Sequence, residues 1–137
     1  MRIASGLPGR VIEALHRGDV ELIQALFDCD FLQPLDTFDL TGREYPVNPE
    51  DSFSMLHVVA RKPCPDYKYM IDILLENGVP LDDGMPSTPL EEAIMYKNFP
   101  TAAYLESKGA TYCLEEVADF LNEYEAYKLH SPISKTH

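Results

Sequence analysis

The stretch Thr88-Pro89-Leu90-Glu91-Glu92-Ala93 opens the part of the chain that decides the fold. The Thr88 hydroxyl can cap the start of a helix, and Pro89 falls at the first helical position, where its missing N–H costs nothing. Apolar residues then recur at spacings of three and four, as one buried helical face requires: Leu90, Ala93 and Ile94. The sequence therefore predicts a short helix that begins at Pro89.

A second helix is predicted directly after the first. The segment Lys97–Phe99 breaks the apolar pattern, and Pro100 then stands where the first turn of a new helix tolerates proline. This second pattern ends at Gly109, the residue type best suited to a left-handed helix end. Two helices joined by so short a connection predict an antiparallel pair.

The same order of features occurs upstream, at Ser54–Ala60 (SMLHVVA) and then at Ile73–Gly78 (ILLENG). The two helix starts, Ser54 and Thr88, are 34 residues apart, whereas the two glycine ends are 31 residues apart. The upstream unit must therefore be three residues longer between its helices, and Pro63–Pro65 is the expected insertion.

These units resemble ankyrin repeats, whose fingerprint T-P-L-H-x-A opens a unit of roughly 33 residues made of a β-turn and two helices. The resemblance covers about residues 9–112. His57 stands at the histidine of the fingerprint, and the resemblance implies that it bonds the turn backbone of its own or the next repeat. Glu91 replaces this histidine in the third unit, and Glu106 replaces the second leucine of the family's Leu-Leu pair. Both departures suggest an unusual or terminal repeat.

The chain before residue 30 is expected to form a first, capping repeat. The segment Leu7–Arg10 is predicted to be a turn, and Gly18 should stop the short helix that follows it. Asp19 is well placed to cap a second helix, whose buried face is predicted to consist of Leu22, Ile23, Leu26 and Phe27.

Residues 30–53 lose the helical pattern and contain Pro34, Pro46 and Pro49. The resemblance places a β-turn at Asp39–Gly42, and the ten residues that follow before Ser54 imply an extended finger. Long connections of this kind are more often functional than accidental.

Beyond Ala110 the sequence predicts one more amphipathic helix, a C-terminal cap at about residues 113–129. Its stripe consists of Leu114, Val117, Phe120, Leu121 and Tyr124. The predicted fold is therefore an all-α ankyrin-repeat solenoid of paired antiparallel helices with β-turn or hairpin fingers, in one domain of residues 1–137. Its parts are repeat 1 (about 9–29), the extended finger (about 30–53), repeat 2 (about 54–78), repeat 3 (about 88–110) and the cap helix.

The formal net charge of −12 opposes direct binding of nucleic acid or of an anionic membrane. A partner protein with a basic surface is favoured, although acidic faces also serve solubility alone. The sequence shows neither a secretory signal nor a run of about eighteen apolar residues, so a cytoplasmic location, in its own cell or a host's, is expected. A monomer is expected as well.

Catalytic and metal-binding patterns are not found in the sequence. The 3 cysteines, Cys29, Cys64 and Cys113, are widely spaced, so we expect reduced, mostly buried thiols and no disulfide or zinc site. The histidines form no H-x-x-x-H or H-E-x-x-H arrangement, and the adjacent acids belong to no pocket motif. We therefore expect no enzyme, no catalytic residues, no metal and no cofactor.

The resemblance implies that the turn tips and first helices line a concave face that binds another protein. The expected partner-binding residues are Arg43, Glu44, Tyr45, Glu50, Asp51, Phe53, Arg61, Lys62, Asp82, Asp83, Glu92, Met95 and Tyr96, and Glu13, Arg17 and Val58 are expected to be exposed on the same face. The predicted function is a protein–protein interaction module. Two alternatives remain: a dedicated acidic inhibitor or immunity protein that blocks a basic toxin or nucleic-acid-binding enzyme, and a nucleic-acid mimic that titrates a DNA-binding protein.

Overall fold

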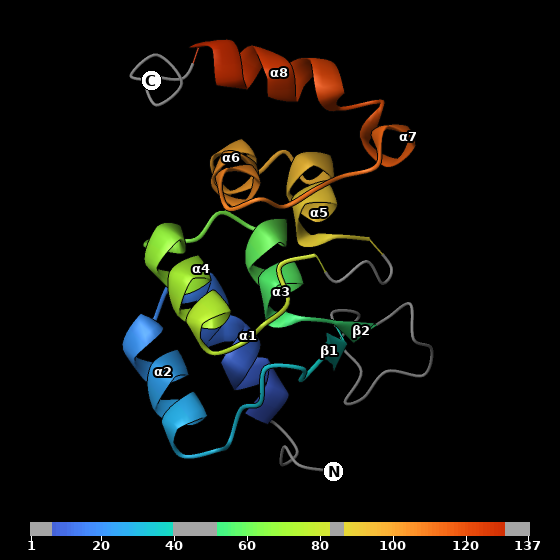
Figure 1. The fold of residues 1–137 in the computed structure, drawn as a ribbon. Coiled ribbons are helices and arrows are strands. Elements are labelled where there is room, and N and C mark those ends of the chain that lie inside the picture. The colour runs from blue at the N-terminus through green and yellow to red at the C-terminus, as the bar shows by residue number, and fades with distance from the viewer. Residues whose placement is uncertain (1–6, 40–51, 83–86, 131–137) are drawn as a thin grey trace.

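The computed structural model describes residues 7–39, 52–82 and 87–130 of the chain, and within these ranges it is helical apart from two short strands (Figure 1). The prediction of an all-α fold is therefore confirmed. The elements are α1 (Leu7–Arg17), α2 (Val20–Asp28), β1 (Phe38–Asp39), β2 (Ser52–Phe53), α3 (Met55–Arg61), α4 (Tyr67–Glu76), α5 (Pro89–Met95), α6 (Phe99–Ser107), α7 (Leu114–Val117) and α8 (Leu121–His130).

The helices form two layers. Helices α1, α3 and α5 pack side by side in one layer, and α2, α4 and α6 pack in the other, so that consecutive helices make three pairs. Helices α7 and α8 contact α5 and α6 respectively and lie across the end of the stack (Figure 1). Strands β1 and β2 pair antiparallel with Phe38 opposite Phe53, and β2 leads directly into α3.

The helix starts are fixed by local hydrogen bonds. The Thr88 hydroxyl accepts from the Glu91 N–H at 3.1 Å, and the Glu91 carboxylate accepts in return from the Thr88 N–H at 2.7 Å. Ser54 and His57 make the same reciprocal pair at the start of α3. Asp19 accepts from the Leu22 N–H at 3.2 Å. The N-caps predicted at Thr88 and Asp19 are confirmed, and Ser54, the predicted start of the upstream unit, caps α3 in the same way.

Glycine ends the helices where the chain turns back. Gly18 has φ +77°, and a Cβ there would lie 2.1 Å from the Pro65 carbonyl oxygen. The end of α1 therefore approaches the loop before α4 so closely that no other residue type fits. Gly109 has φ +100°, as the sequence predicted.

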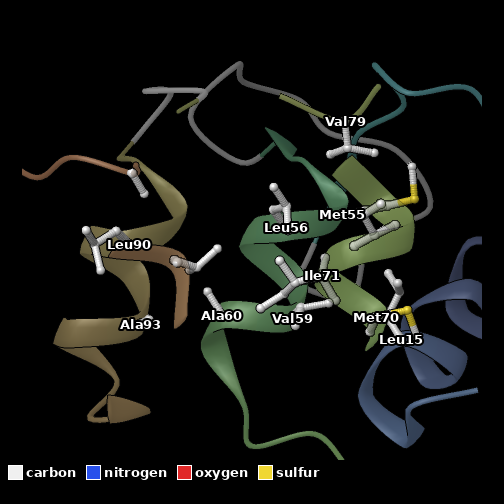
Figure 2. Close-up of a cluster of buried hydrophobic side chains, with 14 of the residues drawn as sticks. Leu15, Met55, Leu56, Val59, Ala60, Met70, Ile71, Val79, Leu90 and Ala93 are labelled. Carbon is white, nitrogen blue, oxygen red and sulfur yellow. The ribbon is translucent and has the colours of Figure 1, made fainter. Parts of the chain in front are cut away.

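The core lies between the two layers. Side chains from α1, α3, α4 and α5 meet there, among them Leu15, Val59, Ile71 and Leu90, each at most 1% exposed (Figure 2). Removing such side chains from water supplies most of the driving force for folding.

Four expectations from the sequence are wrong. Leu7–Arg10 is not a turn, because α1 already begins at Leu7. Leu22 is 39% exposed, because α2 is the outermost helix of its layer and has a neighbouring helix, α4, on one side only of that layer. The cap is two helices and not one, since the chain turns after Val117, and Leu114 is left exposed in the first turn of α7. Cys64 is buried as expected, but Cys29 and Cys113 are exposed at helix ends.

No helix in the described ranges is long and apolar enough to cross a membrane.

Candidate interaction face

The residues predicted to bind a partner divide into two sets. Arg43, Glu44, Tyr45, Glu50, Asp51 and Asp83 lie outside the described residues. Six of the others lie on or directly after three elements: Phe53 on β2, Arg61 and Lys62 at the end of α3, and Glu92, Met95 and Tyr96 at α5. The seventh, Asp82, lies in the connection between α4 and α5.

Four of these residues converge around one guanidinium group, and we call them the Arg61 cluster: Phe53, Arg61, Glu92 and Tyr96. Arg61 Cζ lies 4.7 Å from the centre of the Phe53 ring and 4.6 Å from the centre of the Tyr96 ring. Its Nε forms an ion pair with Glu92 Oε1 at 3.0 Å, and its Nη2 donates to the Tyr96 hydroxyl. Arginine suits this place because its planar group stacks on rings while its edge donates hydrogen bonds.

The backbone brings the cluster together. Arg61 is the last residue of α3. Glu92 lies on α5, the neighbouring helix of the same layer, and Tyr96 follows one helical turn later as the C-cap of α5. Phe53 precedes the N-cap of α3 and reaches Arg61 from the opposite end of that helix. The cluster therefore joins one strand and two helices.

Burial corrects three predicted exposures. Phe53 is 7% exposed and Glu92 is 5% exposed, because Arg61 and Ser87 cover them, and Val58 is completely buried between the helix layers. Tyr96 alone of the cluster presents a large surface, with 49% of the residue exposed. The exposed part of the cluster is therefore mainly the Tyr96 side chain, which packs on Arg61, and not a row of charged side chains.

Glu92 is a buried carboxylate with partners on both oxygens. Oε1 faces Arg61, and Oε2 accepts a hydrogen bond of 2.6 Å from the Ser87 hydroxyl. Breaking such a buried pair by removing one partner costs about 3–5 kcal/mol, because the other charge is left uncompensated.

His57 links two segments just behind the cluster. Its Nδ1 lies 3.2 Å from the Ser54 N–H nitrogen and accepts from it, so Nε2 carries the proton and donates to the Ser87 carbonyl oxygen. The ring also meets Phe53 edge-on, with centroids 5.8 Å apart. The predicted bond from His57 to turn backbone is confirmed, and it fixes the Ser87 residue that in turn holds Glu92.

Glu91 and Glu106, the two acids at which the sequence differs from the ankyrin pattern that it resembles, both bind the C-terminal segment. Glu91 Oε2 accepts from the Cys113 N–H at 2.7 Å. Glu106 Oε1 accepts from the Tyr124 hydroxyl at 2.6 Å and from Lys128 Nζ at 3.0 Å. Glu91 and His57 occupy equivalent positions in their two units. Glu91 accepts a hydrogen bond from a backbone N–H, whereas His57 donates one to a backbone carbonyl oxygen, so each side chain suits the backbone group that it contacts.

The remaining predicted residues contribute less to the cluster. Asp82 is exposed, but its carboxylate accepts from the Thr111 N–H at 3.0 Å, so it ties the two turns together. Lys62 is exposed, and Met95 is half-buried against the core. Glu13 and Arg17 are exposed on α1 and form an ion pair at 3.3 Å.

In the ranges that the structure covers, no group of three or more histidine, cysteine, aspartate or glutamate side chains is placed to hold a metal ion. A scan against protein-family models finds no match to this chain, and searches of the curated proteins and of the solved structures find none either.

Proposed function

We propose that this protein is a non-enzymatic interaction module built from divergent ankyrin-type repeats, and that the face around the Arg61 cluster binds a protein partner. The observation that carries the proposal is the convergence of Phe53, Arg61, Glu92 and Tyr96, which holds an exposed tyrosine in place. The repeat interpretation is supported by the paired helices in two layers and by the matching capping boxes at Ser54 and Thr88.

The cluster has the properties of a binding hot spot. Tyrosine and arginine are enriched among the residues that dominate binding energy, and a side chain ordered before binding loses little entropy on association. Arg61 stacks on the face of the Tyr96 ring and also donates a hydrogen bond to its hydroxyl, so two contacts restrict the rotation of this side chain. Tyr96 can therefore serve as a rigid anchor with an aromatic surface open to a partner.

The partner is expected to be basic. A net charge of −12 accelerates association with a positively charged protein and disfavours nucleic acid or anionic membrane. This charge also favours a second candidate, an acidic inhibitor or immunity protein that blocks a basic toxin or nucleic-acid-binding enzyme. The two candidates differ in whether the bound partner loses an enzymatic activity.

Site-specific photo-cross-linking tests the proposal. A photoreactive derivative of phenylalanine, which keeps an aromatic ring at the position, replaces Tyr96 in one sample. The same derivative replaces Leu129 in the control, since Leu129 is exposed on α8, a helix that contributes no residue to the cluster. The proposal predicts one dominant cross-linked protein from position 96 and none from position 129. Equal cross-linking from both positions would mean that the Arg61 cluster is not the interaction face. An activity assay of the captured protein then separates an adaptor from an inhibitor.

A further inference from the structure

A second surface lies on the other layer of helices, between α4 and α6. A groove of about 70 Å³ opens there, lined by Tyr67, Lys68, Pro100, Ala103, Tyr104 and Ser107. In Figure 1 these two helices lie beside one another on the side away from β1 and β2. The groove shares no residue with the Arg61 cluster, so binding at the groove is independent of the proposed function.

The groove follows from the way α6 is buried. The helix turns Thr101, Ala102 and Leu105 into the core, and the adjoining stripe lines the groove at spacings of three and four: Pro100, Ala103, Tyr104 and Ser107. Ala103 has a small side chain that leaves the space beside the rings of Tyr67 and Tyr104 open. The floor and walls are therefore mostly apolar.

The walls are held rigidly. The rings of Tyr67 and Tyr104 meet edge to face with centroids 6.2 Å apart, and the Tyr104 hydroxyl donates to Asp72 at 2.7 Å. Lys108 Nζ forms an ion pair with the same carboxylate at 3.2 Å. The Ser107 hydroxyl donates to the Tyr104 carbonyl oxygen, so it is already satisfied. A ligand would thus meet a preformed cleft.

The rim of the groove is positive, although the protein is strongly acidic. Lys68 Nζ lies 5.7 Å from the centre of the Tyr104 ring and Lys108 Nζ lies 5.0 Å from it. Asp72 compensates Lys108, whereas Lys68 is exposed and forms no ion pair with any carboxylate of the described residues. The charged groups at the groove therefore leave one positive charge uncompensated, at Lys68.

We propose that this groove binds a short partner segment that places one apolar side chain over Ala103, against the rings of Tyr67 and Tyr104, and a neighbouring carboxylate at Lys68. The volume fits a single aliphatic side chain and excludes a large ring system. The charge of Lys68 selects an acidic segment, in contrast to the basic partner expected at the Arg61 cluster. The protein would then join two partners of opposite charge through opposite layers of its helices.

The test uses the full chain labelled with ¹⁵N and two small probes, N-acetyl-leucine, which carries a carboxylate, and its uncharged amide. The proposal predicts saturable chemical-shift changes confined to the lining residues, with an affinity in the millimolar range that suits so small a probe. The amide, and N-acetyl-leucine added to a Lys68→Gln variant, should each bind about two- to fivefold more weakly, as loss of an exposed ion pair implies.

Matched variants keep the test decisive. Arg10→Gln removes a positive charge at an exposed position of α1, a helix of the other layer, and should leave the affinity unchanged. Ala103→Leu should fill the groove and abolish the shifts, and the wild-type shift pattern elsewhere in its spectrum would show that it is folded. No saturable shift in the wild type, equal affinity for acid and amide, or unchanged binding by a folded Ala103→Leu variant would each overturn the proposal.

Discussion

The Tyr124 hydroxyl donates a 2.6 Å hydrogen bond to Glu106 Oε1, which joins α8 to α6 at the end of the helix stack. Tyr124 is completely buried, and burial together with this bond raises its pKa well above the ordinary value of a tyrosine. The corresponding residue of the preceding unit is Leu75, which packs against the core. Glu106 therefore converts a position used for apolar packing into a polar anchor for the terminal helix.

Glu106→Leu should accordingly destabilise the protein even though leucine occupies the corresponding position, Leu75, of the preceding unit. The change leaves the Tyr124 hydroxyl and Lys128 without their acceptor, and an unsatisfied buried group costs about 1–3 kcal/mol. Urea denaturation followed by circular dichroism measures this loss. Glu106→Gln keeps an acceptor for Tyr124 and is the control, which should lose less. If Glu106→Leu were as stable as the wild type, α8 would not be anchored by this carboxylate.

His57→Ala should lower stability without altering partner binding by the folded protein. The substitution leaves the Ser54 N–H and the Ser87 carbonyl oxygen unpaired and opens a cavity beside Phe53, so a loss of about 2–4 kcal/mol is expected. Calorimetry gives the stability, and titration of the cross-linked partner gives the affinity. Normal stability with lost binding would assign His57 to recognition instead.

Leu74→Ala tests the cooperative core. Leu74 is fully buried on α4, and truncations at such positions cost about 2–5 kcal/mol. The exposed Leu129 provides the comparison, since Leu129→Ala should change the free energy of unfolding by less than about 0.5 kcal/mol. Chemical denaturation that showed less than about 1 kcal/mol for Leu74→Ala would disagree with the burial of this residue.

The protein should lose stability between pH 9 and pH 11 through Cys64. Burial raises the pKa of this thiol from 9.0 to about 11, and its Sγ donates to the Leu15 carbonyl oxygen at 3.1 Å. The native state therefore holds a proton that the unfolded chain releases above pH 9.0, so the contribution is complete below that pH and disappears as the pH rises toward 11.

Comparison of variants isolates this contribution. The pKa values of Tyr67 and Tyr104 are also raised by burial, so the wild type loses stability from several groups at alkaline pH. Cys64→Ala should be about 1–2 kcal/mol less sensitive to the change from pH 8.5 to pH 11. Denaturation curves at the two pH values measure the difference. Identical pH dependence in both proteins would show that the thiol titrates normally.

The sequence predicted those features that depend on neighbouring residues. Thr88, Ser54 and Asp19 cap helices through bonds to residues three positions away, and Gly109 ends a helix through its own φ angle. Such short-range chemistry can be inferred from residue types and spacing. The order and the approximate limits of the helices could therefore be predicted from the caps and the glycine ends.

Long-range contacts could not be predicted in the same way. Glu91 was recognised as unusual, but its partner Cys113 lies 22 residues downstream. The resemblance places Glu92 on the exposed concave face, yet Arg61 and Ser87 reach it and bury it. Arg61 and Tyr96 were both expected on the interaction face, but their stacking depends on how α3 and α5 pack.

The binding affinity of a Tyr96→Ala variant for the protein cross-linked at position 96 tests the central proposal most directly. Isothermal titration should show a loss of at least about 2 kcal/mol, roughly thirtyfold in Kd, if Tyr96 is the anchor of the interaction face. Leu129→Ala should bind as the wild type does, and both variants should unfold at nearly the wild-type denaturant concentration. Wild-type affinity of a folded Tyr96→Ala protein would contradict the assignment of the Arg61 cluster as the site of recognition.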